Sequence, residues 1–112
     1  MSTDTPDPRL ADISVTHNPQ RSRYEILDGD TVVGHADYRD GEGTRRVFVH
    51  TEVDENYGGL GLAGRLVKFA LDDVAAHDGR IVPVCPYVAR YVAEHHEYDT
   101  IVDRPEGTHE TQ

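Results

Sequence analysis

The chain has 112 residues, a formal net charge of -10 and 37% hydrophobic residues, enough for one domain around a small core. This acidity argues against nucleic acid as the main partner, because phosphate binding needs a basic surface. No run of roughly 18 apolar residues predicts a membrane span, and the N-terminal sequence lacks the features of a signal peptide. The single cysteine, Cys85, allows no disulfide within the chain, so we expect a cytoplasmic protein.

The first half of the chain has the pattern of an antiparallel meander. Residues 1–10 are rich in Pro, Thr and Asp, and we expect a disordered tail there. Four strand-like segments follow, and they are "DISVTH" (12–17), "SRYEIL" (22–27), "TVVGHADY" (31–38) and "RRVFVHTEV" (45–53). The sequences "DGD" (28–30) and "DGEG" (40–43) are typical of tight turns, so we expect neighbouring strands to pair.

The hydrophobic period changes to a helical one after residue 61. A predicted helix has its apolar positions at Leu62, Leu66, Phe69, Ala70 and Val74, and we expect it to end at Asp78 and Gly79, with Gly79 as the left-handed cap. "RIVPVC" (80–85) predicts a fifth strand. A second helix is predicted to start at Pro86, and its apolar stripe is Tyr87, Val88, Tyr91 and Val92.

The element order is β-β-β-β-α-β-α, which predicts an α/β (α+β) protein with a mixed, mostly antiparallel sheet. Because a helix connects the fourth and fifth strands, a right-handed crossover makes these two strands parallel. We expect a single domain over residues 11–102 and a disordered tail over residues 103–112.

A glycine-rich loop, "YGGLGLAG" (57–64), separates the fourth strand from the first helix. Glycines here let the backbone approach a ligand closely, and their N–H groups add to the free donors of the helix N-terminus. The loop contains G-x-G-x-x-G, but an NAD site also needs an acidic residue ending the next strand, and "PVC" has none. Arg65 directly follows Gly64, which excludes the "GK[ST]" of a P-loop. The pattern therefore favours a different pyrophosphate ligand.

Three segments together resemble a known family. "HTEV" (50–53), "YGGLGLAGRLVKFALD" (57–72) and "VPVCPYVARYVAEHHEY" (82–98) look like the smallest members of the GCN5-related N-acetyltransferase superfamily, specifically the minimal Yjdj-type family. The match spans roughly residues 23–102. The superfamily loop reads Q/R-x-x-G-x-G/A, and here Gly58, Gly61 and Ala63 take its defined positions. Gly58 departs from the pattern, because it removes a side chain that often contacts the pyrophosphate.

The resemblance implies that acetyl-CoA lies where the fourth and fifth strands splay apart. The implied contacts with the coenzyme are Val53, Gly58, Gly59, Leu60, Gly61, Leu62, Ala63 and Tyr91. Arg65, Lys68 or Arg80 would supply charge to its phosphates. The two helices that usually form an acceptor pocket are absent, since nothing helical is predicted before Asp28.

Cys85 is the first candidate catalytic residue. Pro86 is favoured at the first helical position, which places Cys85 at the N-cap, where a thiolate interacts favourably with the helix dipole. The thiol would act as a nucleophile that forms an acetyl-cysteine, or as a proton carrier. Small members of the resembled family are thought to use this cysteine.

His50 is the second candidate, as the base for the amine or for Cys85. Strict alternation predicts that His50 shares a face with Phe48 and Glu52, while Val47, Val49, Thr51 and Val53 take the other face. Glu52 would orient His50 or accept the proton itself. The resemblance also implies a role for Tyr91, as the acid that protonates the departing coenzyme A thiolate.

The sequence predicts an acetyl-CoA-dependent N-acetyltransferase, with a non-catalytic coenzyme A-binding module as the alternative. The histidines of "EHHEY" (94–98) do not have the spacing of a metal site, and we expect none. The acceptor is an amine of a small molecule or a protein, and its identity stays open. A homodimer that completes the acceptor site is also left open.

Overall fold

The computed structural model describes residues 11–104, so the tail predicted at residues 1–10 and most of the tail predicted at residues 103–112, with His109, lie outside the described residues. The described elements run in the order predicted, with three short 3-10 turns added. They are β1 (Ile13–Asn18), η2 (Pro19–Arg21), β2 (Arg23–Asp28), β3 (Thr31–Asp40), β4 (Arg45–Val53), η3 (Glu55–Tyr57), α1 (Leu62–Ala76), β5 (Arg80–Pro83), α2 (Pro86–Glu94) and η4 (His96–Ile101). The helical content before Asp28, predicted to be nil, is the single turn η2.

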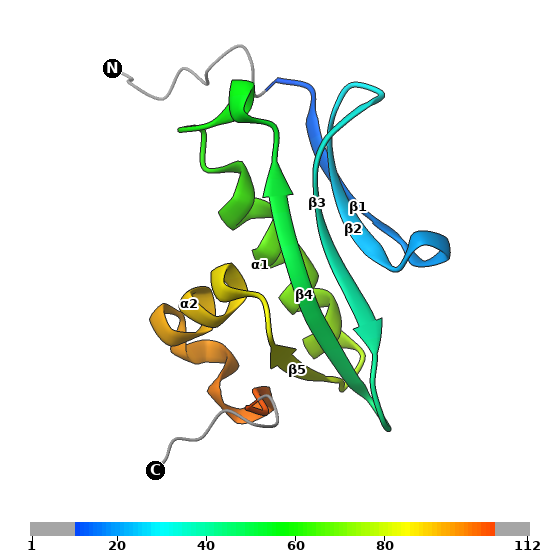
Figure 1. Cartoon of the computed structure of the whole chain (residues 1–112), viewed down its shortest axis with the longest axis vertical. Helices are drawn as coiled ribbons and strands as arrows, with labels where there is room; N and C mark the ends of the chain where they lie inside the picture. Colours follow the sequence, from blue (N-terminus) through cyan, green and yellow to red (C-terminus); the bar gives the residue numbers. More distant parts are fainter. Residues whose placement is uncertain (1–10, 105–112) are drawn as a thin grey trace.

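The five strands form one mixed sheet in the order β1-β2-β3-β4-β5 (Figure 1). The pairs β1–β2, β2–β3 and β3–β4 are antiparallel, whereas β4 and β5 are parallel. The predicted turns form as expected, because Gly29 and Gly43 have φ values of 60° and 63°, which side chains rarely adopt. The predicted fold class is confirmed.

A β-bulge interrupts the pairing of β3 with β4. Tyr38 pairs with Phe48 and Asp37 pairs with His50, so Val49 is an extra residue without a partner across the ladder. Each bulge reverses the alternation of side chains beyond it. Phe48 therefore shares a face with Thr51 rather than with His50.

Helix α1 covers one face of the sheet and contributes six residues to the buried core. Its buried residues are Leu62, Leu66, Val67, Ala70, Leu71 and Val74. They pack against Tyr24, Ile26, Ala36 and Phe48 of the strands in one cluster that also includes Val88 and Val92 of α2. The predicted stripe is wrong at Phe69, which is 41% exposed, because the buried stripe is rotated toward Val67 and Leu71 and leaves Phe69 at its edge.

The end of α1 differs from the prediction. Asp78, not Gly79, has the left-handed conformation, with φ 59°. Gly79 is needed for space instead, since a Cβ atom there would lie 2.9 Å from Val74 Cγ1 and 3.0 Å from the Thr44 carbonyl oxygen. The tight contact lets the chain turn directly into β5.

Strand β5 ends at Pro83, two residues earlier than predicted, because proline lacks the N–H that continues a ladder. The chain after α2 returns to this edge: Val102 forms a parallel bridge with Ile81, and the Asp103 N–H donates to the Ile81 carbonyl oxygen at 2.8 Å. Asp103, assigned to the tail in the sequence analysis, thus contacts the folded domain. Within residues 11–104 no helix has the length and apolar character needed to cross a membrane.

Candidate functional site

The gap between β4 and β5 opens beyond Phe48. The last pair of the parallel ladder is Phe48 with Pro83, whereas β4 continues to Val53. The chain leaves β5 toward α2, so the two parallel strands diverge (Figure 1). Residues 49–53 of β4 are therefore not paired with β5, and they border the region where the two strands diverge.

Cys85 lies at the start of this gap. Its N–H donates to the Phe48 carbonyl oxygen at 2.7 Å, and its Sγ is 3.4 Å from Thr51 Oγ1. The predicted position at the N-cap of α2 is confirmed, although the side chain makes no capping hydrogen bond. The thiol is free and only 3% exposed. Thr51 was not singled out from the sequence, because strict alternation did not reveal that its hydroxyl faces Cys85.

The glycine loop forms the other border of the gap. Gly59 and Gly61 have φ values of 79° and 75°, and a Cβ atom at either would meet nothing within 4 Å. Gly61 is the N-cap of α1, and no side chain caps this end. Because the first N–H groups of a helix have no partner within it, the amides of Leu62 and Ala63 are available to an anion. The loop therefore fits a pyrophosphate.

His50 and Glu52 lie on the face of the sheet opposite α1. His50 Nε2 is 3.0 Å from Glu52 Oε1, and the two side chains are 54% and 61% exposed. The prediction that both share a face with Phe48 is wrong, because the bulge at Val49 reverses the alternation. Cys85 Sγ contacts Thr51, and adjacent strand residues point to opposite faces, so the structure does not bring His50 and Cys85 together.

Two residues that the sequence analysis did not single out accompany His50 and Glu52. His35 Nδ1 is 2.9 Å from Asp37 Oδ1, and His35 Nε2 is 4.0 Å from Glu52 Oε2. The period-two spacing of His35 and Asp37 within the third strand was the available signal. The pKa of Glu52 is lowered, first by its hydrogen bond with His50 and then by the charge of His35.

Tyr91 is half-buried on α2, where its ring stacks on His95 with centroids 3.8 Å apart. Burial raises the pKa of its phenol, so the group keeps its proton at neutral pH. Tyr87, on the same helix, lies near the glycine loop, since its hydroxyl is 3.6 Å from where a Cβ of Gly64 would be. The start of α2 thus borders the loop.

The three basic residues expected near the phosphates are placed differently. Lys68 Nζ bonds Asp72 Oδ2 at 2.8 Å, and Arg65 Nη2 donates to the Ile13 carbonyl oxygen at 3.3 Å. Arg80 follows the far end of α1, about 22 Å along the helix from the loop at 1.5 Å per residue, and it is bonded to Asp103. The expectation that Arg80 serves the phosphates is therefore wrong.

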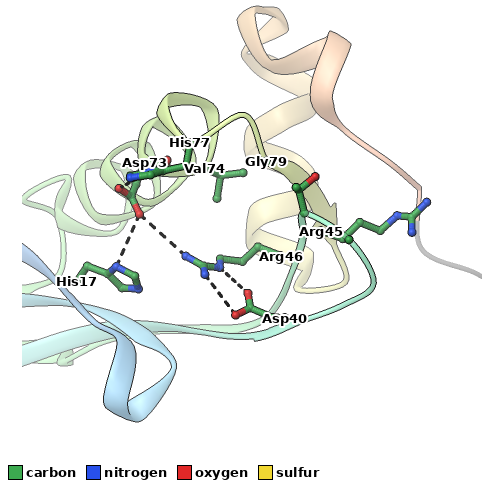
Figure 2. A pocket seen from close by; sticks show the side chains of 10 residues that line it. His17, Asp40, Arg45, Arg46, Asp73, Val74, His77 and Gly79 are labelled. Atoms are coloured by element: carbon green, nitrogen blue, oxygen red, sulfur yellow. Dashed lines mark hydrogen bonds and ion pairs between the residues drawn. The ribbon is translucent and has the colours of Figure 1, made fainter.

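A polar cavity of about 410 Å³ lies at the opposite end of the domain, near the C-terminus of α1. Figure 2 shows Asp73 between His17 and Arg46, at 3.7 and 4.0 Å, while Arg46 also bonds Asp40 at 2.8 Å. Burial lowers the pKa of His17, and the charge of Arg46 acts in the same direction. These interactions connect α1 to β1, β3 and β4, which indicates a structural network. Over residues 11–104, no three His, Cys, Asp or Glu side chains are arranged so that they could hold a metal ion together.

The comparisons with known proteins agree with this geometry. A family described as GCN5-related N-acetyltransferase matches residues 23–101. Protein NATD1 from Homo sapiens is 44% identical over 86 residues, covering 73% of this chain and 74% of that protein, and NATD1 from Mus musculus is 38% identical, with 73% and 76% covered.

Two solved structures share the fold. A GCN5-like protein from Staphylococcus aureus superposes with a TM-score of 0.66 at 16% identity, covering 91% of this chain and 99% of the other. A ribosomal-protein-alanine N-acetyltransferase from Brucella melitensis gives a TM-score of 0.51 at 18% identity, covering 82% and 70%. The superfamily resemblance is thereby confirmed, while the Yjdj-type assignment stays a prediction.

Proposed function

The chain belongs to the GCN5-related N-acetyltransferase family and is an N-acetyltransferase, and from this we propose that it transfers the acetyl group of acetyl-CoA directly to a primary amine. The observation that carries the proposal is the divergence of β4 and β5 after Phe48 and Pro83, between an uncapped helix N-terminus and a thiol. This arrangement supports a ligand with an anionic end and a thioester end. The support that this arrangement gives does not depend on any one side chain.

The loop would hold the pyrophosphate. Gly59, Leu60, Gly61, Leu62 and Ala63 would present backbone donors, and Gly59 and Gly61 leave space for close approach. Gly58 would contact the ligand without donating, because its N–H donates to the Glu55 carbonyl oxygen at 3.1 Å. The pantetheine would pair with β4 near Val53, in the manner of a strand added to an open edge. Tyr91, protonated at neutral pH, would serve the departing thiolate from α2.

The amine would approach from the open face. His50 and Glu52 are more than half exposed there, so even the amine of a protein chain has access to them. Acetyl transfer requires the ammonium group to lose a proton before its nitrogen attacks the thioester carbonyl. Because Glu52 engages His50 Nε2, the other ring nitrogen, Nδ1, is available to take that proton.

Cys85 would act from the other side of the gap as a proton carrier. Its Sγ is bonded to the Thr51 hydroxyl, which is no base, so nothing at this contact converts the thiol to the thiolate that an acetyl-cysteine route needs. Direct transfer is therefore the proposal, and the acetyl-cysteine route is the alternative. Catalysis is favoured over a non-catalytic coenzyme A-binding module because the matched family consists of acetyltransferases.

The test is isothermal titration with acetyl-CoA, and with NADH in parallel, for the wild type, Gly61→Ala and Gly43→Ala. Both glycines have positive φ and open space for a Cβ, so both variants carry a similar backbone strain of about 1–2 kcal/mol. We expect acetyl-CoA to bind the wild type and Gly43→Ala equally. Gly61→Ala should bind about tenfold more weakly, the loss of roughly one hydrogen bond to a charged group.

Thermal unfolding of both variants would show whether the loss reflects binding rather than stability. Wild-type protein that binds neither ligand, or that binds NADH, would overturn the proposal. Equal affinities in the two glycine variants would mean that the loop does not hold the phosphates. Release of coenzyme A thiol in the presence of an amine then separates an enzyme from a binding module.

A further inference from the structure

Four polar side chains form a compact cluster on the open face of the sheet, and we call it the His35–Glu52 cluster. It consists of His35, Asp37, His50 and Glu52. Two short contacts run along the strands, His35 Nδ1 to Asp37 Oδ1 at 2.9 Å and His50 Nε2 to Glu52 Oε1 at 3.0 Å. Two others cross between strands: His35 Nε2 lies 4.0 Å from Glu52 Oε2, and the two imidazole rings are 6.1 Å apart.

The backbone register fixes this cluster. Asp37 lies directly opposite His50, and His35 lies directly opposite Glu52. Side chains in such positions are close neighbours on one face. Without the bulge at Val49, the alternation of β4 would carry His50 and Glu52 to the other face, away from His35. The bulge is thus what assembles a histidine and carboxylate cluster next to the gap.

Glu52 is the carboxylate that lies next to both histidines. On the side of β2, Glu25 is the register partner of His35, but it is buried and already bonded by Arg23 Nε at 2.8 Å and by Asn18 at 3.3 Å. Asp37 is the register partner of Arg23, which lies on the neighbouring strand β2. Glu52 has one oxygen toward His50 and the other toward His35.

We propose that His35, oriented by Asp37, is a positioning residue that holds Glu52 against His50 Nε2 and so keeps His50 Nδ1 free to take the proton of the acceptor amine. The inference rests on the proposed function, in which His50 is the base. Asp37 accepts the Nδ1–H of His35, which aims Nε2 at Glu52. In the protonated ring Nδ1–H donates to Asp37, and the positive charge of the ring faces Glu52 Oε2 at 4.0 Å from Nε2.

The proton balance is simple. The ammonium N–H bond breaks and the proton passes to His50 Nδ1, while His50 Nε2–H continues to donate to Glu52 Oε1. The freed lone pair of the amine then forms the C–N bond at the thioester carbonyl, which gives a tetrahedral intermediate whose nitrogen still carries two protons. As the C–S bond breaks, the nitrogen loses the second of these protons and the coenzyme A thiolate gains one, so the products are the amide and the free thiol. Glu52 remains a carboxylate throughout and stabilises the positive charge on His50.

Substitutions at His35 separate the two contacts of its ring. In His35→Gln the amide nitrogen occupies roughly the place of Nε2 and keeps a donor toward Glu52, whereas in His35→Asn it occupies roughly the place of Nδ1 and keeps only the contact with Asp37. Asp37→Asn removes the orienting carboxylate. The control is His96→Gln, since His96 forms a similar exposed contact with Asp99 at 3.2 Å, outside the sheet.

The first readout needs no acceptor: long-range ¹H–¹⁵N spectra report the tautomer of each histidine. We expect His50 to carry its proton on Nε2 in the wild type, His96→Gln and His35→Gln, and to populate both tautomers in His35→Asn and Asp37→Asn. The second readout is thiol release from acetyl-CoA with Nα-acetyl-lysine amide as the amine, measured across pH. There, kcat/KM for the amine should fall about tenfold in His35→Asn and less in His35→Gln, with KM for acetyl-CoA unchanged.

An unchanged tautomer of His50 in both His35→Asn and Asp37→Asn would overturn the inference, as would equal losses in the Gln and Asn variants. A wild type that shows the expected tautomers and yet neither binds nor consumes acetyl-CoA would instead refute the proposed function. The two failures are therefore distinguishable.

Discussion

At the scale of single residues, the environment of Cys85 determines what its thiol can do. The side chain is buried, and its sulfur has a hydroxyl as its partner at 3.4 Å. A nucleophilic cysteine is usually paired with a histidine or another base that takes its proton, and His50 lies on the opposite face of the sheet. These surroundings fit the role of a proton carrier better than that of a nucleophile.

We therefore expect Cys85→Ala to lower kcat by about a hundredfold or more, because one general acid–base contribution is worth roughly 10²–10⁴-fold. The affinity for acetyl-CoA should stay within a factor of about three, because the backbone donors of the loop are unchanged. Cys85→Ser is the matched variant and should retain part of the rate. Mass spectrometry of wild-type protein quenched after mixing with acetyl-CoA alone should show no bound acetyl group, and an acetyl group on Cys85 would establish the alternative route.

The residues that border the candidate site were easier to predict from the sequence than the face of the sheet on which each of them lies. Cys85 was placed correctly at the N-cap of α2 by Pro86, because proline is favoured at the first position of a helix. His50 was placed on the wrong face, because a single unpaired residue, Val49, shifts the register. A bulge depends on hydrogen bonding with the neighbouring strand, so the sequence of β4 alone does not predict it.

At the scale of elements, some boundaries were predictable from the sequence, whereas the end of β5 at Pro83 was not. β4 spans Arg45–Val53 as expected, and α2 begins at Pro86. The buried stripe of α1 was less predictable, because it depends on how the helix axis lies across the sheet: Phe69 is exposed, while Val67 and Leu71 are buried. Likewise, the roles of Asp78 and Gly79 depend on a contact with Thr44, which is distant in sequence.

The junction between α1 and β5 gives a prediction that depends on this correction. Asp78→Gly should raise the free energy of unfolding by about 0.5 kcal/mol, because relief of left-handed strain exceeds the entropy cost of glycine. Gly79→Ala should lower it by about 1–3 kcal/mol, because the new Cβ overpacks against Val74 and the Thr44 carbonyl. Urea unfolding measures both. If Asp78→Gly is instead destabilising, the left-handed position has been assigned to the wrong residue.

At the scale of the whole molecule, the candidate site and the network of ion pairs lie at opposite ends of α1. The gap, the glycine loop and Cys85 lie where β4 ends and α1 begins, whereas the network of Arg46 with Asp40 and Asp73 lies at the other end of α1 (Figures 1 and 2). Asp103 belongs to that second end. It is bonded by Arg80 Nη2 at 2.8 Å and by Arg45 Nε at 3.0 Å, and so connects the chain after η4 to the starts of β4 and β5.

This separation leads us to expect that Asp103→Asn lowers stability without changing the affinity for acetyl-CoA. The hydrogen bond from Arg80, and then that from Arg45, lower the pKa of Asp103 below 3.8, so the unfolded chain binds its proton more readily than the folded one. The contribution is therefore complete above about pH 4 and disappears as the pH falls through the lowered folded-state value. Since Asp103 and Arg80 are 24% and 41% exposed, we expect Asp103→Asn to lower the free energy of unfolding by about 1 kcal/mol at neutral pH, and by less at high salt.

Urea unfolding of the wild type and Asp103→Asn from pH 3 to 7 should give stability curves that converge in acid. The control is Asp99→Asn, because Asp99 is an exposed partner of His96. Curves that stay parallel would show that the Asp103 carboxylate does not anchor this segment.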